Sequence, residues 1–170
     1  QVGKTWLMKE FARLQFKKVA YINFDDNPRL LRLFSQDMSP KRLIEGLIIE
    51  SEVEIDPKDT LIIFDKIQEC PQALKSLKYF NEEAPEYAIV AAGSLLGVAL
   101  HKNTSFPVGK VSFMHLYPLS FSEFLNALDQ NRLLKLLLDS KWDMITTFKD
   151  KYIQLLREYY YVGGMPEAVL

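Results

Sequence analysis

The sequence contains a single cysteine, Cys70, and only two histidines, His101 and His115. One cysteine excludes a disulfide within the chain and fits a reducing compartment, so we expect a cytoplasmic protein. Two histidines without cysteine partners argue strongly against a zinc site built from His and Cys ligands. The chemistry left to the chain is that of carboxylates, lysines and backbone amides.

Long apolar runs and an excess of charge are lacking as well. The longest apolar runs, such as Tyr87–Ala92, are far too short to span a bilayer. A formal net charge of -1 gives no electrostatic case for nucleic acid binding. We therefore expect no membrane as partner and find no clear signal for a nucleic acid, while a local basic patch on one face stays open. A protein partner is unknown, and assembly into a homo-oligomer stays open.

Helical and strand patterns alternate over the first two thirds of the sequence. The expected elements are helices near 4–15, 30–35, 41–51 and 72–82, and strands near 19–26, 60–65, 86–94 and 109–117. Residues 61–64 form a continuous apolar run, which is typical of a strand covered on both faces. The alternation therefore predicts an α/β fold with a parallel sheet.

From residue 118 onward the pattern becomes helical, with helices expected near 120–128, 131–138 and 148–160. We therefore expect two domains. Residues 1–117 form an α/β core, and residues 118–170 form a small helical lid or the start of a C-terminal region.

The N-terminal residues resemble half of a phosphate-binding loop. Gly3, Lys4 and Thr5 match the last three positions of the pattern G-x-x-x-x-G-K-[ST], whose first glycine would lie upstream of Gln1. In such a loop, backbone N–H groups and the start of a helix face phosphate oxygens. The strand that normally precedes the loop is missing, so we expect a sheet without its first strand.

The roles expected at this loop follow from the pattern. Lys4 would reach the β and γ phosphates, and the Thr5 hydroxyl would bind Mg²⁺. The expected nucleotide-binding residues are Gln1, Val2, Gly3, Lys4, Thr5 and Trp6.

A lone Gly-Lys-Thr is a weak signal, and a second motif strengthens it. Asp65 ends the apolar segment TLIIFD, where a carboxylate can hold Mg²⁺ beside Thr5. A carboxylate that only caps the next turn is the alternative. Because both motifs occur in the expected order and spacing, the sequence favours a nucleotide site with Mg²⁺ over a chance match.

The third candidate is Ser94, which follows the next expected strand. A polar residue there can sense the γ-phosphate or orient the attacking water. It can equally cap the helix that starts after it, and both interpretations stay open.

Five segments together resemble an AAA-type ATP-binding family of bacteria and archaea. They are QVGKT (1–5), DxIQxxP (65–71), AAGSLL (91–96), LYPLSFSEFL (116–125) and YVGGMPEAV (161–169). The resemblance implies a three-layer P-loop ATPase that hydrolyses ATP with Mg²⁺, followed by a small helical lid. Members of the family usually continue into a C-terminal domain, which is absent from this sequence.

One position departs from the family. Where relatives carry Asp-Glu, this sequence has Asp65 and Lys66. The glutamate normally polarises the water that attacks the γ-phosphate, and a protonated lysine cannot do so. The implied catalytic positions are thus Asp65, Lys66 and Ser94, with hydrolysis slowed or abolished by Lys66. Glu69, one helical turn on, is a weaker substitute.

Three further features have two interpretations each. Lys110 could approach the nucleotide, although a solvated loop charge is the simpler interpretation. Asp25 and Asp26 could help to bind Mg²⁺ or water, although capping of the turn before Pro28 is favoured. The tyrosines at 159–161 could stack on a base, although packing is favoured.

Three functions stay open at this point. The first is an ATPase, the second a switch that binds ATP without turnover, and the third an interaction module that has lost the nucleotide. GTP is not excluded as a substrate in place of ATP.

Overall fold

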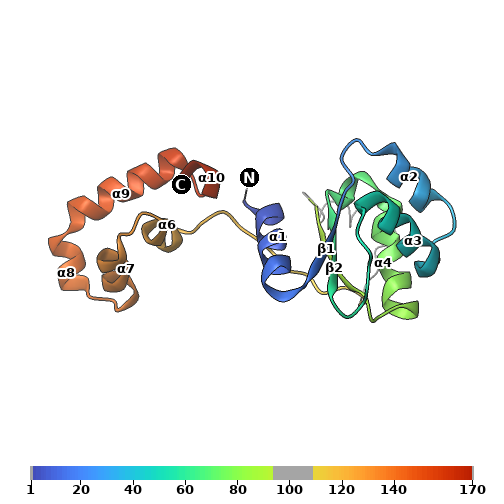
Figure 1. The fold of residues 1–170 in the computed structure, drawn as a ribbon. Coiled ribbons are helices and arrows are strands. Elements are labelled where there is room, and N and C mark those ends of the chain that lie inside the picture. The colour runs from blue at the N-terminus through green and yellow to red at the C-terminus, as the bar shows by residue number, and fades with distance from the viewer. Residues whose placement is uncertain (1, 94–108, 170) are drawn as a thin grey trace. The chain divides into compact units, whose positions relative to one another are not determined.

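A computed structural model describes residues 2–93 and 109–169 of the chain, which divides into two compact units (Figure 1). The first, here called the sheet unit, spans Thr5–Phe113. The second, the helical unit, comprises Met114–Leu170 and the residues Gln1–Lys4. Each unit is described by itself.

The sheet unit is built from three parallel strands in the order β1-β2-β3. Its elements in chain order are α1 (Lys4–Gln15), β1 (Lys18–Asn23), α2 (Pro28–Ser35), α3 (Pro40–Ser51), β2 (Thr60–Asp65), the 3₁₀ turn η1 (Ile67–Glu69), α4 (Pro71–Glu83) and β3 (Ala88–Ala92). The register aligns Asn23 with Asp65, and Asp65 with Ala92. The carboxyl ends of all three strands therefore meet at one edge, and the predicted parallel α/β sheet is confirmed.

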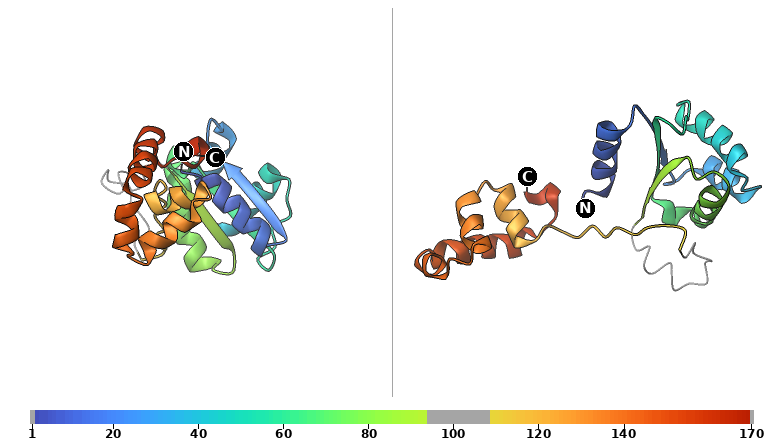
Figure 2. Two further views of the ribbon diagram at one scale, coloured as in Figure 1. Left: turned by 90° about the vertical axis from the view of Figure 1, so that its left-hand side faces the viewer. Right: turned by 90° about the horizontal axis from the view of Figure 1, so that it is seen from below.

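Helices cover both faces of the sheet, with α1 on one face and α2, α3 and α4 on the other (Figures 1 and 2). Because side chains alternate along a strand, β2 contributes to both layers. Leu61 and Ile63 pack with Met8 and Ala12 of α1, whereas the neighbouring positions of β2 pack toward α2–α4. All six residues of β2 are buried. Because both faces of β2 are buried, its sequence contains an unbroken run of apolar residues.

Three phenylalanines pack α2 against the carboxyl ends of β1 and β2. Phe24, Phe34 and Phe64 form an edge-to-face triad with ring centroids 5.4 to 5.8 Å apart. All three side chains are fully buried. The triad lies next to the carboxyl ends of β1 and β2, so it makes that edge of the sheet rigid.

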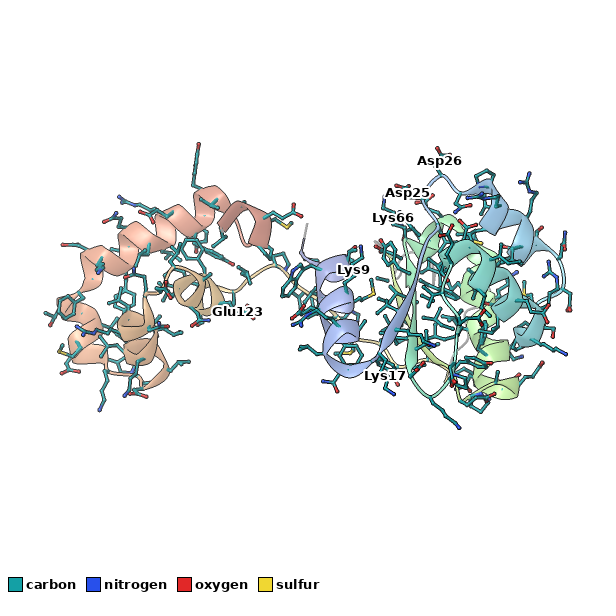
Figure 3. The ribbon with its side chains drawn as sticks, viewed as in Figure 1. Lys9, Lys17, Asp25, Asp26, Lys66 and Glu123 are labelled. Carbon is teal, nitrogen blue, oxygen red and sulfur yellow. The ribbon has the colours of Figure 1, made fainter. Side chains whose placement is uncertain are left out.

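The helical unit packs short helices around a small core. Its helices are α6 (Phe121–Ala127), α7 (Asn131–Leu138), α8 (Trp142–Thr147), α9 (Lys149–Val162) and α10 (Pro166–Val169). The buried side chains of its core are Leu125, Leu133, Tyr152 and Leu155. Helix α6 begins with a capping box: the Ser120 hydroxyl accepts from the Glu123 amide, and the Glu123 carboxylate accepts from the Ser120 amide. Glu123 is labelled in Figure 3. The backbone N–H of Ser120 lowers the pKa of the Glu123 carboxyl.

Two of the motif segments meet within the helical unit. The Leu119 amide donates to the Gly164 carbonyl at 2.7 Å, and the Tyr159 hydroxyl donates to the Leu119 carbonyl at 2.7 Å. A Cβ on Gly164 would come within 2.4 Å of the Leu119 oxygen. Gly163 has a φ of 79°, in the left-handed region that favours glycine. The paired glycines therefore serve a turn and a close backbone contact.

The strand expected at 109–117 is wrong, because these residues form no strand. Phe113, Met114 and Tyr117 are more than half exposed. The segment has the composition of a strand, but strand formation also needs a paired edge and a covered face, and the described residues provide it with neither. Helices α8 and α10 were not expected. None of the helices in the described part of the chain combines the length and apolar character that a bilayer crossing needs.

The packing expected for the tyrosines at 159–161 holds fully for Tyr159, while Tyr160 contacts only the edge of this packing through the Tyr159 ring, 6.0 Å away. The Tyr159 ring lies 5.7 Å from that of Phe121 and 5.3 Å from that of Phe124. Tyr160 and Tyr161 are 75% and 93% exposed because they lie on the outer side of α9.

We predict that Tyr159→Phe loosens the attachment of the segment around Leu119 to α9. The ring would keep its packing, but the hydrogen bond to the Leu119 carbonyl would be lost, at a cost of about 1 kcal/mol. Amide hydrogen exchange at Leu119 should accelerate about fivefold. Tyr161→Phe, on the same helix, is the matched control and should leave this exchange unchanged. Equal effects of the two substitutions would contradict the assignment.

Candidate functional site

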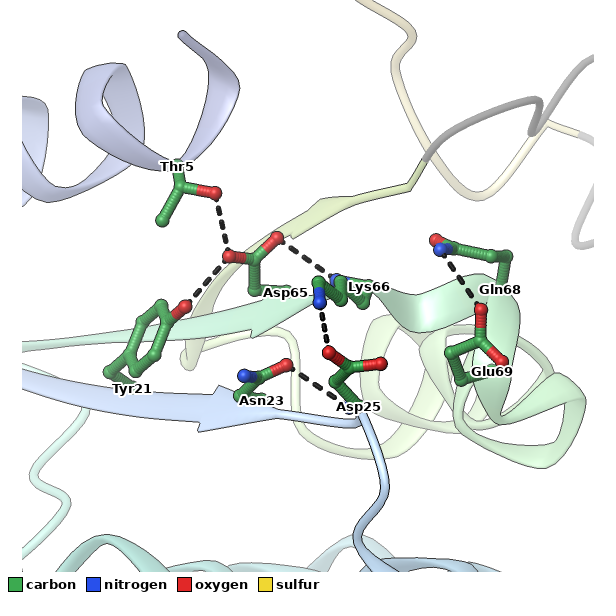
Figure 4. A network of polar contacts seen from close by, with 8 residues as sticks. All are labelled: Thr5, Tyr21, Asn23, Asp25, Asp65, Lys66, Gln68 and Glu69. Carbon is green, nitrogen blue, oxygen red and sulfur yellow. Dashed lines mark hydrogen bonds and ion pairs between the residues drawn. The ribbon is translucent and has the colours of Figure 1, made fainter. Parts of the chain in front are cut away.

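The site is centred on the carboxylate of Asp65, the last residue of β2 (Figure 4). Asp65 is only 6% exposed. The Thr5 hydroxyl donates to its Oδ2 at 2.7 Å, across a separation of 60 residues. The two residues that the sequence predicted as metal ligands are therefore in direct contact.

Local structure explains this contact. Helix α1 begins at Lys4, and its packing on β2 through Met8 and Ala12 brings its first turn to the carboxyl edge of the sheet. Asp65 follows Ile63 by two positions, so both side chains lie on the face that α1 covers.

Tyr21 also belongs to the site, and the sequence reasoning missed it. Its hydroxyl donates to Asp65 Oδ2 at 2.7 Å. Tyr21 pairs with Ile63 in the register, so Asp65 is its diagonal neighbour on the same face. A signal was available, because a tyrosine in a buried aliphatic strand needs a partner for its hydroxyl.

The hydroxyl of Tyr21 keeps its proton and acts as a hydrogen-bond donor. Burial, followed by the hydrogen bond to Asp65, raises the pKa of Tyr21 to about 12. The ammonium of Lys9 lies 4.0 Å from the centre of the Tyr21 ring, on the face presented to α1. At neutral pH the phenol is therefore protonated and donates to the carboxylate.

Lys66 turns away from this pair of hydroxyls. Its backbone adopts φ 55° and ψ 40°, a left-handed conformation that is uncommon for a residue with a side chain. Its amide donates to Asp65 Oδ1 at 2.9 Å, and its ammonium forms an ion pair with Asp25 (Figures 3 and 4). The hydrogen bond to Asp25 raises the pKa of Lys66. Position 66 therefore presents a positive charge, which is directed to Asp25.

The remaining predicted residues lie at the start of α1 or outside the described residues. Gly3 has a φ of 83°, and an added Cβ would meet no heavy atom within 4 Å. Lys4 is the first residue of α1, and Val2 is half-buried. Trp6 is 69% exposed. Gln1 and Ser94 fall outside the described residues.

Lys110 lies away from this site. Its ammonium is 3.2 Å from Glu82 in the last turn of α4. That turn precedes β3, so Lys110 is placed at the edge where the strands begin, opposite Asp65. This contact favours the loop-charge interpretation over an approach to the nucleotide.

The favoured capping role of Asp25 and Asp26 is wrong. The side chain of Asn27 caps α2 by accepting from the Leu30 amide, while Asp25 pairs with Lys66. Asp26 and Glu69 instead border an open pocket of about 350 Å³. Its lining residues are Phe24, Asp26, Asn27, Pro28, Leu31 and Glu69. Neither Thr5 nor Asp65 lines it.

The oxygen donors of the site fit magnesium with a nucleotide. Mg²⁺ prefers oxygen ligands and is usually bound through one or two carboxylates together with substrate phosphates and water. Thr5 and Asp65 supply a hydroxyl and a carboxylate side by side. No group of three or more His, Cys, Asp or Glu side chains in residues 2–93 and 109–169 is arranged to hold a metal by itself. The protein donors thus suit a metal that phosphates complete.

The parallel sheet with helices on both faces, and the start of α1 at its carboxyl edge, define an α/β fold of the P-loop NTPase type. A family model described as an AAA domain matches residues 1–125. The chain therefore belongs to this AAA domain family, and membership implies nucleotide binding. No curated protein and no solved structure matches the chain significantly.

We predict that backbone strain at residue 66 is measurable. Lys66→Gly and Lys66→Ala both delete the ion pair with Asp25, but only glycine adopts φ 55° without a Cβ penalty. The glycine variant should melt about 4 °C above the alanine variant in thermal unfolding followed by circular dichroism. An alanine variant of equal or greater stability would show that the left-handed conformation carries no strain.

Proposed function

We propose that this AAA domain binds ATP with Mg²⁺ at the carboxyl edge of the sheet and hydrolyses it slowly to ADP and phosphate. The observation that carries the proposal is the hydrogen bond of 2.7 Å between Thr5 and Asp65. It joins the start of a helix to the carboxyl end of a parallel strand, which is where phosphates and metal ions bind in such folds.

Each residue of the proposed site has a distinct role. The backbone amides near Gly3 and the start of α1 bind phosphate oxygens, with Lys4 supplying a positive charge. Thr5 and Asp65 hold Mg²⁺, which neutralises phosphate charge when bound. Ser94 senses the γ-phosphate.

Lys66 supports a second candidate, a switch that binds ATP without turnover. Its ammonium is paired with Asp25, and this contact keeps the lysine protonated. A protonated amine cannot take a proton from water, so general-base help at this position is lost. In this second candidate the protein acts through the difference between its ATP-bound and ATP-free forms, and hydrolysis is not needed.

A narrower family membership is part of the proposal. The segments LYPLSFSEFL and YVGGMPEAV resemble those of AAA-type ATP-binding proteins of bacteria and archaea. The hydrogen bond from the Leu119 amide to the Gly164 carbonyl joins the two segments, which supports the assignment.

We predict that Lys4→Ala in the full-length protein weakens ATP binding. Loss of a charge-assisted contact with phosphate should lower the affinity by about 10- to 100-fold, as measured by titration calorimetry with ATP and Mg²⁺. Parallel titration with GTP tests which base is preferred.

Lys17→Ala is the matched control for this binding experiment. Lys17 lies just beyond the other end of α1, far from Asp25 and Lys66 in the same unit (Figure 3). Its substitution should leave the affinity unchanged. A Lys4→Ala variant that binds ATP as tightly as the unchanged protein would contradict the phosphate-loop assignment.

We predict that Lys66→Glu increases the rate of phosphate release by about 100-fold, since a positioned base typically contributes this much. The affinity for ATP should change little, because position 66 is not assigned a binding role. Lys66→Gln, which removes the positive charge without supplying a carboxylate, should stay slow.

The comparison separates the two candidates. Slow but measurable release by the unchanged protein supports the ATPase, whereas binding without any release supports the switch. Equal rates for the unchanged protein and Lys66→Glu would rule out Lys66 as the cause of slow hydrolysis.

A further inference from the structure

The acceptor positions of the Asp65 carboxylate are unequally occupied. Oδ2 accepts hydrogen bonds from both Thr5 and Tyr21, each 2.7 Å long, and Oδ1 accepts one from the Lys66 amide (Figure 4). A carboxylate oxygen offers about two acceptor positions. Both positions of Oδ2 are therefore filled, and the capacity that Asp65 retains for a metal or its water lies on Oδ1.

Packing from both the sheet and α1 fixes the position of Tyr21. Its ring packs with the cluster of Met8, Ala12, Leu61 and Ile63 on the α1 face of the sheet. Lys9 of α1 lies over the ring at 4.0 Å, so the ring is held from the helix as well as from the sheet. A tyrosine has few rotatable bonds, so a ring fixed in this way gives its hydroxyl a defined position.

We infer that Tyr21 is a positioning residue for magnesium binding by Asp65. Its hydroxyl keeps Asp65 Oδ2 engaged and fixes the rotation of the carboxylate that, together with Thr5, would hold the metal. The inference rests on the proposed function, in which Asp65 and Thr5 hold Mg²⁺. Partners of this kind, which orient a metal ligand without touching the metal, commonly change metal affinity by 10- to 100-fold.

The test is Tyr21→Phe in the full-length protein, which removes one oxygen and keeps the ring. ATP binding is measured by calorimetry across a magnesium titration and again with the metal chelated. The variant should need about tenfold more Mg²⁺ for half-maximal enhancement of ATP binding. Its affinity for ATP without metal should equal that of the unchanged protein.

Tyr87→Phe is the matched control. Tyr87 is half-buried, and it packs on the cluster that faces α2–α4, just before β3 begins. The same loss of a hydroxyl there should leave the magnesium dependence unchanged.

Each possible result either supports or overturns the positioning role of Tyr21. A Tyr21→Phe variant with the magnesium dependence of the unchanged protein overturns the positioning role. A loss of affinity that is the same with and without metal also overturns it, because a packing defect would act in both states. If the unchanged protein binds no ATP, the proposed function fails as well, and that outcome is distinguishable because no titration curve is obtained.

Discussion

The buried carboxylate of Asp65 is the constraint on which the arrangement of the sheet unit depends. A charge that is 6% exposed is costly unless hydrogen bonds satisfy it. Thr5, Tyr21 and the Lys66 amide supply these bonds. The donors come from α1, from β1 and from the turn after β2, so satisfying one carboxylate fixes the start of a helix against two strands. Apolar packing alone, through Met8 and Ala12, would hold α1 on the sheet without specifying where its first turn lies.

The helical unit is held together by contacts of a different kind. There the two motif segments meet through the backbone, where the Leu119 amide donates to the Gly164 carbonyl, and the Tyr159 hydroxyl of α9 donates to the Leu119 carbonyl. Gly164 is required by the close approach of Leu119, and Gly163 by its positive φ. These requirements account for the two glycines of the second segment without any chemistry on a ligand. A sequence motif therefore does not by itself identify a site.

Much of the sheet unit was predictable because its signals are local. The run at 61–64 indicated a strand buried on both faces, and the order of Thr5 and Asp65 indicated their meeting. Tyr21 was missed since its role depends on the register of β1 against β2, which a single sequence does not display. The pair formed by Lys66 and Asp25 likewise depends on two turns at the same edge. The strand expected at 109–117 failed because strand propensity is realised only beside a partner.

The proposed site separates the groups assigned to nucleotide binding from the position assigned to water activation. Lys4, Thr5 and Asp65 belong to the start of α1 and the end of β2, and packing and hydrogen bonds fix that junction. Residue 66 lies outside it, in a left-handed turn, with its side chain directed to Asp25. Exchanging a carboxylate for an ammonium at that point therefore leaves the contacts of Asp65 in place, because Lys66 contributes to them only through its backbone amide. The contacts that hold Thr5 against Asp65 therefore do not depend on which side chain stands at position 66, so the presence of a phosphate loop is weak evidence for hydrolysis.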